Sequence, residues 1–336
     1  MIGLIGTLLK GRSFLFGVKH SKHITLILLA LFIVAQYLGI AILYSYVDPV
    51  QTTATGQMTF RDAPFVERPE LEEDTSYIPI MISIIVGTVI VLILMRFRLH
   101  AVWKGWFLLS IVISLTVAFG AFVPAIVALV LAVGLGVWKI FRPNFWVHNG
   151  TEIFMYGGLA SIFVPVLNLF SVSILMVLIG VYDAYAVWKS KHMITLAKET
   201  TKARVFAGLF VPYGKDGFKK VDEKKVEKVE SSSKVHKDLK PHTSTSAHST
   251  SAHIQPPQPR TAILGGGDIA FPLLFAGVVF KEIGLWQSLI IPLFALAGLG
   301  LLLWYGKQDR FYPAMPFIGA GCFVGLGVVW LIGLLL

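Results

Sequence analysis

The sequence predicts an all-α membrane protein in which nine helices cross the bilayer. Of its 336 residues, 55% are hydrophobic and only 14% are charged, and its mean hydropathy is +0.74, whereas about a quarter of the residues of a soluble domain are charged. The apolar residues also gather into runs of about eighteen without a charge, a length typical of transmembrane helices. These runs lack the alternation of barrel strands, so helices are the expected spanning structure.

The expected spans follow one another with one long interruption. We place the boundary between the third and fourth spans at Gly120–Pro124, because the uncharged stretch around it is too long for one crossing and glycine and proline favour a turn. A similar boundary lies at Asn168, between the fifth and sixth spans. The nine expected spans are residues 24–47, 78–95, 105–120, 123–138, 152–167, 169–188, 262–280, 284–305 and 314–336.

The chain is expected to consist of three parts. Residues 1–189 carry six spans, residues 190–261 form a flexible loop, and residues 262–336 carry the last three spans. The middle part is rich in Lys and Glu and then in Ser, Thr, His and Pro, a composition with too few apolar residues to offset the entropy of ordering. Its first stretch, residues 193–211, is expected to continue the sixth helix. The single cysteine, Cys322, has no partner for an intrachain disulfide.

Lysines and arginines of the short loops indicate the orientation. With a cytoplasmic N-terminus, eleven of them flank the inner ends of the spans and only Arg61, Arg68 and Lys281 lie outside. Because positive charge favours the cytoplasmic side, we expect the N-terminus and the loop 190–261 in the cytoplasm and the C-terminus outside. The chain is then a multi-pass protein of the cell membrane, in contact with the lipid bilayer, and its net charge of +10 requires no nucleic-acid partner.

Two acidic residues lie inside the expected spans. Of the nineteen aspartates and glutamates, fourteen lie in the first outer loop and the long inner loop, and Glu152, Glu282 and Asp309 lie at span ends. We interpret Glu152, with His148 nearby, as an interfacial group. Only Asp183 and Asp268 remain, and a charged group at such depth costs about 2.5–3.5 kcal/mol on insertion scales, which makes a functional site the default interpretation.

The two aspartates are expected at matching depths. Asp183 lies six residues before Lys189, about 9 Å along a helix, and Asp268 lies eight residues after Arg260, about 12 Å by the same rise. They belong to consecutive antiparallel spans, so their side chains can face each other. Two carboxylates a few ångströms apart in a low dielectric share one proton. Such a pair can activate water and polarise a peptide carbonyl, as in an aspartic protease, without a metal or another cofactor.

The sequence around the aspartates suits this chemistry. Gly265, Gly266 and Gly267 precede Asp268 and allow another chain to approach closely. Pro272 lacks the N–H that would bond the Asp268 carbonyl, so the helix is expected to be loosened there.

Three short motifs resemble those of the presenilin and signal-peptide-peptidase family of intramembrane aspartyl proteases. Tyr182-Asp183 is similar to the family's Tyr-Asp motif, Gly265-Gly266-Gly267-Asp268 to its Gly-Leu-Gly-Asp motif, and Pro313-Ala314-Met315 to its Pro-Ala-Leu motif. They occur in family order on the sixth, seventh and ninth spans. Gly266 and Met315 depart from the family pattern, which has leucine at both positions.

This resemblance implies a presenilin-like fold and a catalytic role for Asp183 and Asp268. It also implies that Gly265 and Gly267 shape the backbone beside the acid, that Pro313, Ala314 and Met315 line the site and position substrate, and that Tyr182 supports its neighbour. The cytoplasmic N-terminus favours the presenilin-like branch, and the compact loops favour a microbial, archaeal homologue.

Three functions remain open from the residues alone. The first is an intramembrane endopeptidase that cuts transmembrane-helix substrates, and it is compatible with a homo-oligomer. The second is a proton- or cation-coupled transporter that uses the same two acids. The third is a prepilin-peptidase-like aspartyl protease, which cuts leader sequences outside the membrane. We also expect the Gly-xxx-Gly pair of Gly321 and Gly325 to serve helix packing rather than substrate contact.

Overall fold

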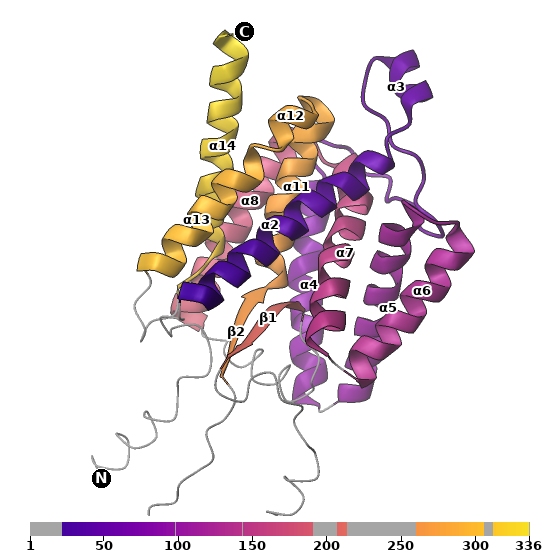
Figure 1. The fold of residues 1–336 in the computed structure, drawn as a ribbon, viewed down its shortest axis with the longest axis vertical. Helices are drawn as coiled ribbons and strands as arrows, with labels where there is room; N and C mark the ends of the chain where they lie inside the picture. The colour runs from indigo at the N-terminus through magenta and orange to yellow at the C-terminus, as the bar shows by residue number, and fades with distance from the viewer. Residues whose placement is uncertain are drawn as a thin grey trace, which may run out of the picture. The chain divides into compact units, whose positions relative to one another are not determined.

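The computed structural model describes residues 22–97, 99–142, 144–190, 207–213, 260–305 and 312–335. The chain forms two compact units, Met1–Val211 with Ala262–Leu336 and Pro212–Thr261. The first unit is mainly helical (Figure 1). The predicted Lys/Glu-rich and Ser/Thr/His/Pro-rich tracts lie in the second unit, outside the described residues.

Each of the nine predicted spans overlaps one long helix of the described residues. These helices are α2 (Lys22–Ser45), α4 (Tyr77–Arg96), α5 (His100–Gly120), α6 (Ala125–Phe141), α7 (Phe145–Phe163), α8 (Leu169–Tyr185), α11 (Gly266–Glu282), α13 (Ile291–Tyr305) and α14 (Met315–Leu335). Short helical segments also occur in the loops, at α3 (Pro49–Thr55), η1 (Val164–Val166), η2 (Ala186–Ser190) and α12 (Leu285–Ser288).

Six helical stretches of the described chain are long and apolar enough to cross a membrane. They are His23–Ser45, Tyr77–Leu94, Ala101–Gly120, Leu169–Lys189, Leu285–Tyr305 and Met315–Leu335. Helix α6 is apolar but has only 17 residues. The number of spans beyond these six therefore stays a prediction.

The helix boundaries at Gly120–Pro124 and at Asn168 are where the sequence predicts them. Helix α5 ends at Gly120 and α6 begins at Ala125. Asn168 lies between η1 and α8, and its Oδ1 accepts a hydrogen bond of 2.8 Å from the Ser171 N–H. A side chain of this type satisfies one of the free N–H groups at a helix start, which explains why the chain begins a new helix here.

The expectation of an all-α chain is wrong at two short segments, which form a sheet. Strand β1 (Gly208–Tyr213) pairs with strand β2 (Arg260–Gly265), and β2 leads directly into α11 (Figure 1). Residues 208–211 therefore do not continue the sixth helix, and the predicted seventh span, 262–280, begins as a strand. The Gly266 N–H donates to the Ala207 carbonyl at 3.2 Å, so the start of β1 meets the end of β2 and the strands are antiparallel.

The pattern of burial explains why these segments are strands. Leu209 and Val211 are buried in β1, and Ala262 and Leu264 are buried in β2, while the residues between them are more accessible. Alternate burial is the period of a strand with one covered face.

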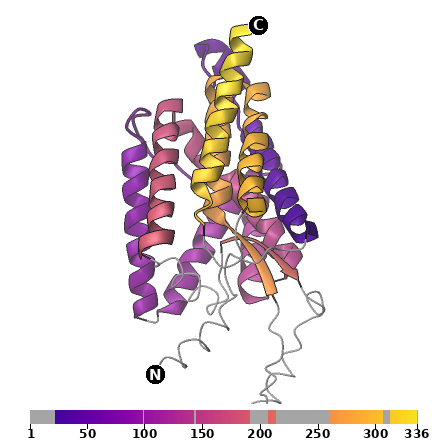
Figure 2. The same cartoon turned by 90° about the vertical axis from the view of Figure 1, so that its left-hand side faces the viewer.

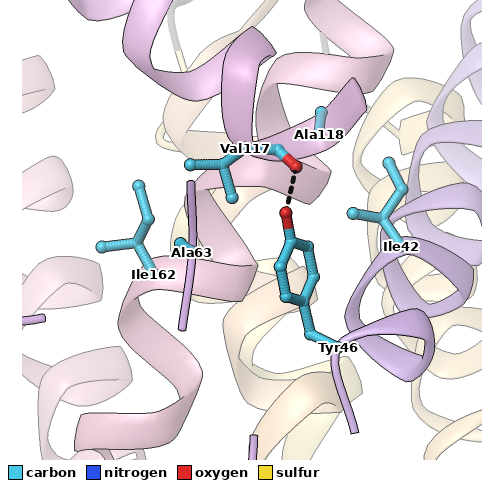
Figure 3. Close-up of a cluster of buried hydrophobic side chains, with 6 residues drawn as sticks. All are labelled: Ile42, Tyr46, Ala63, Val117, Ala118 and Ile162. Atoms are coloured by element: carbon cyan, nitrogen blue, oxygen red, sulfur yellow. Dashed lines mark hydrogen bonds between the residues drawn. The ribbon is translucent and has the colours of Figure 1, made fainter. Parts of the chain in front are cut away.

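Helix α7 packs against α2, α5 and α11. Where α2 ends, the Tyr46 hydroxyl donates a 2.6 Å hydrogen bond to the Val117 carbonyl of α5 (Figure 3). A cluster of buried apolar side chains surrounds this bond and joins α2, α5 and α7 to the loop that follows α3. The cluster consists of Ile42, Tyr46, Ala63, Val117, Ala118 and Ile162.

Helices α13 and α14 lie side by side (Figures 1 and 2). A Cβ added to Gly321 would overlap the Phe294 carbonyl oxygen of α13, and one added to Gly325 would lie 3.2 Å from the Phe294 Cβ. The predicted packing role of this Gly-xxx-Gly pair is confirmed, since both glycines allow close approach of α13.

Candidate active site

Asp268 lies in the first turn of α11, directly after strand β2. Its carboxylate turns back toward the start of its own helix, because a Cβ built on Gly265 would lie 3.1 Å from the Asp268 Oδ2. The Gly265 backbone is hydrogen-bonded to this carboxylate. On the other side of the turn, the buried Gln36 of α2 donates a 2.8 Å hydrogen bond from its Nε2 to the Ile269 carbonyl. The position of the acid is thus fixed by contacts before and after it.

Asp183 lies in the last turn of α8, where the helix passes into the π-helical turn η2. The Met315 N–H donates to Asp183 Oδ2 at 3.2 Å, and the Ala314 backbone is also hydrogen-bonded to this carboxylate. Pro313 and Met315 are buried. The start of α14 therefore holds the carboxylate through its backbone.

The two aspartates lie within electrostatic range of each other. Helices α8, α11 and α14 pack against one another, and the Asp183 carboxylate acts electrostatically on Asp268. The structure thus brings together the end of α8, the start of α11 and the start of α14, which the sequence predicts to meet. Tyr182 is half-buried next to Asp183.

The glycines before Asp268 have different surroundings. None of them has a positive φ, so their backbone conformation does not require glycine. A Cβ on Gly266 would lie 2.7 Å from the Tyr156 hydroxyl oxygen of α7, whereas one on the exposed Gly267 would come no closer than 3.6 Å to the Phe271 ring. At Gly266 the approaching group is thus the protein's own tyrosine, which occupies the space that a leucine side chain would need.

Pro272 does not interrupt α11. The helix continues from Gly266 to Glu282 with Pro272 buried inside it. The expected loosening is therefore limited to the missing hydrogen bond between a residue-272 N–H and the Asp268 carbonyl, and the helix geometry persists.

Glu152, which the sequence analysis interprets as an interfacial group, is buried inside the protein, and its depth in the membrane stays a prediction. Its side chain is 0% exposed and forms an ion pair with Lys139 of α6, whose side chain is 2% exposed. The Tyr156 hydroxyl, one turn further along α7, donates to Glu152 Oε2. A Glu and a Tyr four residues apart on one helix face, preceded by a lysine at the end of the previous span, are the sequence signal that identifies such a network.

Comparisons with known proteins agree with this arrangement. A family model described as signal-peptide peptidase, presenilin aspartyl protease matches residues 29–336. Two similar solved structures are both described as a presenilin family intramembrane aspartate protease, one in the C222 and one in the P2 space group. The first is 18% identical, covers 92% of this chain and 99% of its own, and has a TM-score of 0.56. The second is also 18% identical, covers 91% and 96%, and has a TM-score of 0.54.

No curated protein matches the chain. The structural likeness, at 18% identity, establishes the fold, and the family match extends over nearly the whole sequence. The match includes Asp183 and Asp268, the glycines before Asp268 and the segment Pro313–Met315. The chain therefore belongs to the signal-peptide peptidase and presenilin family and is a multi-pass intramembrane aspartyl protease.

Proposed function

We propose that Asp183 and Asp268 are the catalytic pair of this protease and that its substrates are transmembrane helices. The observation that carries the proposal is the placement of Asp183, whose Oδ2 accepts a 3.2 Å hydrogen bond from the start of α14, a helix that also packs against α11, the helix of Asp268. Helices from both parts of the chain thus contribute one acid each to a single site.

The pair shares one proton, and each carboxyl group has a separate task. The ionised carboxylate takes a proton from a water molecule, whose oxygen attacks the carbonyl carbon of the substrate peptide bond. The protonated carboxyl group donates its proton to the carbonyl oxygen, which gives a tetrahedral diol. The C–N bond then breaks as the first carboxyl group gives the proton that it took from water to the leaving amine. The second takes a proton back from a hydroxyl of the diol, so that both products are released and the pair again holds one proton. Neither a metal nor another cofactor takes part.

The segment Pro313–Met315 is proposed to position the substrate. Its backbone already contacts Asp183, and Pro313 and Met315 are buried. A substrate chain held beside this segment would lie next to the acid. Tyr182 and the glycines 265–267 complete the surroundings of the site.

The membrane topology is proposed to comprise nine spans with a cytoplasmic N-terminus, as in the presenilin-like branch. Two contacts support the alternating direction of the helices. The end of α6 meets the first half of α7 through Lys139 and Glu152, and the end of α8 meets the start of α14 through Asp183 and Met315. Both contacts then belong to the cytoplasmic side, where we place the catalytic site.

The direct test is cleavage of a model transmembrane peptide by the purified protein in lipid vesicles. We expect Asp183→Asn and Asp268→Asn each to lower the cleavage rate by at least about a hundredfold, the usual size of a lost general acid or base, with unchanged thermal unfolding. Asp62→Asn is the matched control, since the Asp62 side chain is fully exposed in the outer loop, and it should leave the rate unchanged.

Mass spectrometry of the products separates the three functions considered. Cuts within the apolar part of the peptide support the intramembrane protease, and cuts confined to a leader outside it support the prepilin-peptidase-like enzyme. Ion or solute flux without any cleavage supports the transporter. Full activity of either Asn variant contradicts the proposed catalytic pair.

A further inference from the structure

A buried carboxylate on α7 has more partners than helix packing requires. Glu152 is ion-paired with Lys139, accepts a hydrogen bond from the Tyr156 hydroxyl, and accepts a 3.0 Å hydrogen bond from the Gly208 N–H at the start of β1. Removing a carboxylate and an ammonium from water is strongly unfavourable, and apolar residues of similar size often pack as well. The geometry of this group therefore indicates a task other than stability alone.

The same face of α7 binds the backbone of β1 at two further points. His148 Nε2 lies 2.9 Å from the Gly208 carbonyl oxygen. Asn149 forms two bonds to Phe210, one from its Nδ2 to the carbonyl oxygen at 2.9 Å and one from the Phe210 N–H to its Oδ1 at 3.0 Å. Two adjacent side chains and Glu152 thus bind one edge of the strand.

The two backbone edges of strand β1 have different partners. Successive backbone N–H and C=O groups of a strand point to opposite sides. Gly208 and Phe210 point to α7, whereas Ala207 points to the other strand and accepts the 3.2 Å bond from the Gly266 N–H. Strand β1 is therefore held between side chains of α7 and the segment that carries Asp268.

Two routes lead from Glu152 to Gly266, two residues before Asp268. One passes through Gly208 and its neighbour Ala207 to the Gly266 N–H. The other passes through Tyr156, whose hydroxyl occupies the space beside Gly266. The Tyr156 hydroxyl and Asp268 also lie within electrostatic range. A displacement of the Glu152 carboxylate would therefore move both Tyr156 and the start of β1, which contact Gly266.

We propose that Glu152 is a positioning residue of the protease, which fixes strand β1 and the segment Gly265–Asp268 through Tyr156 and Gly208 and so sets the distance between Asp268 and Asp183. The proposal rests on the catalytic role of Asp268 proposed above. Lys139 acts as the counter-charge that holds the carboxylate in place, and His148 and Asn149 keep the strand in register.

The test compares Glu152→Gln and the double variant Lys139→Gln/Glu152→Gln with wild type in lipid vesicles. The double variant leaves no unpaired buried charge, so it keeps the test open if the single variant fails to fold. Thr151→Val is the matched control, because Thr151 is buried on the same helix and donates only to the His148 carbonyl of its own helix. Cleavage of the transmembrane peptide and amide hydrogen exchange are measured on each.

We expect kcat to fall at least tenfold in the folded Glu152 variants while KM changes less than twofold, because substrate still binds but Asp268 is displaced. Exchange should rise at residues 208–211 and 265–268 and stay unchanged in α5 and α14. The control should resemble wild type in both measurements. A folded double variant with wild-type kcat, or one whose exchange at 265–268 is unchanged, overturns the proposal.

The outcomes distinguish this proposal from the one on which it rests. Hydrogen exchange reports the position of the segment whether or not Asp268 is catalytic. If Asp268→Asn stays active while Glu152→Gln still raises exchange at 265–268, the catalytic pair is wrong and the structural link holds. If Asp268→Asn is inactive and the Glu152 variants match wild type, only the positioning role fails.

Discussion

At the scale of single residues, the candidate site depends on a glycine, which has no side chain, as much as on the side chains that surround it. The space beside Gly266 is occupied by the Tyr156 hydroxyl, which is itself held by Glu152. Sequence analysis located both aspartates and all three motifs, because an acidic residue within a long apolar run can be recognised from the sequence alone. It did not find the role of Tyr156 or Glu152, because that role depends on Gly208 of β1 and Gly266 of α11, which lie more than fifty residues away in the sequence.

The pair of Gly266 and Tyr156 gives a prediction for stability. Gly266→Ala should lower the unfolding temperature, because the new methyl group would lie 2.7 Å from the Tyr156 hydroxyl oxygen. Adding Tyr156→Phe removes that oxygen and leaves the ring carbon at 3.4 Å, so the two changes should couple favourably by about 1–2 kcal/mol in a double-mutant cycle.

Thermal unfolding of the four proteins in detergent measures this coupling. Gly267→Ala is the matched control, since a Cβ there meets only Phe271 at 3.6 Å. It should show no coupling to Tyr156→Phe. Additive effects at Gly266 would mean that the hydroxyl does not occupy the space.

At the scale of elements, the helices could be predicted from the sequence and the sheet could not. Uncharged runs about as long as the bilayer is thick identified the helices, and Gly120–Pro124 and Asn168 gave the boundaries. Strands β1 and β2 have only six residues each and are separated by nearly fifty. Their pairing depends on α7 side chains that satisfy the free edge of β1, so no local pattern could indicate it.

Helix α7 gives the prediction at this scale, because two of its glycines have opposite surroundings. A Cβ added to Gly158 would overlap the Ser114 carbonyl oxygen of α5, whereas Gly150 has no neighbour within 4 Å. Gly158→Ala should therefore destabilise the protein by at least about 2 kcal/mol, since the backbone of α5 must move. Gly150→Ala should be neutral or stabilising by about 0.5–1 kcal/mol, the usual gain in a helix interior.

Reversible unfolding of both variants in mixed micelles provides the measurement. The difference between the two matters more than either value, because the substitution is the same on the same helix. Equal effects would show that α5 and α7 do not approach closely at Gly158.

At the scale of the whole molecule, both parts of the chain contribute to the candidate site. Helix α11 packs against α2, α7 and α8 and buries residues such as Leu273 and Phe275. Lys281, near its end, donates to Glu73 at 2.7 Å and to the Pro165 and Leu167 carbonyls at 3.1 Å. The described helices of the two parts are therefore connected by packing, in addition to the covalent connection through residues 214–259.

A chain cut in that segment should stay assembled and active. We expect a protein with an inserted protease site near residue 245, once cut, to co-purify as two fragments and to retain at least half of its cleavage rate. Affinity purification through a tag on one fragment, followed by the peptide assay, tests this. Separation of the fragments in mild detergent would contradict the role assigned to α11.

The two-stranded sheet has a consequence for how an unwound substrate can be held. In the described chain, β1 pairs with β2 along one edge and with polar side chains of α7 along the other. Both backbone edges of β1 are therefore already hydrogen-bonded. The remaining edge of the sheet is that of β2, and β2 leads directly into the helix that carries Asp268. Because both backbone edges of β1 are already hydrogen-bonded, an unwound substrate strand cannot pair with β1 without displacing α7 or β2.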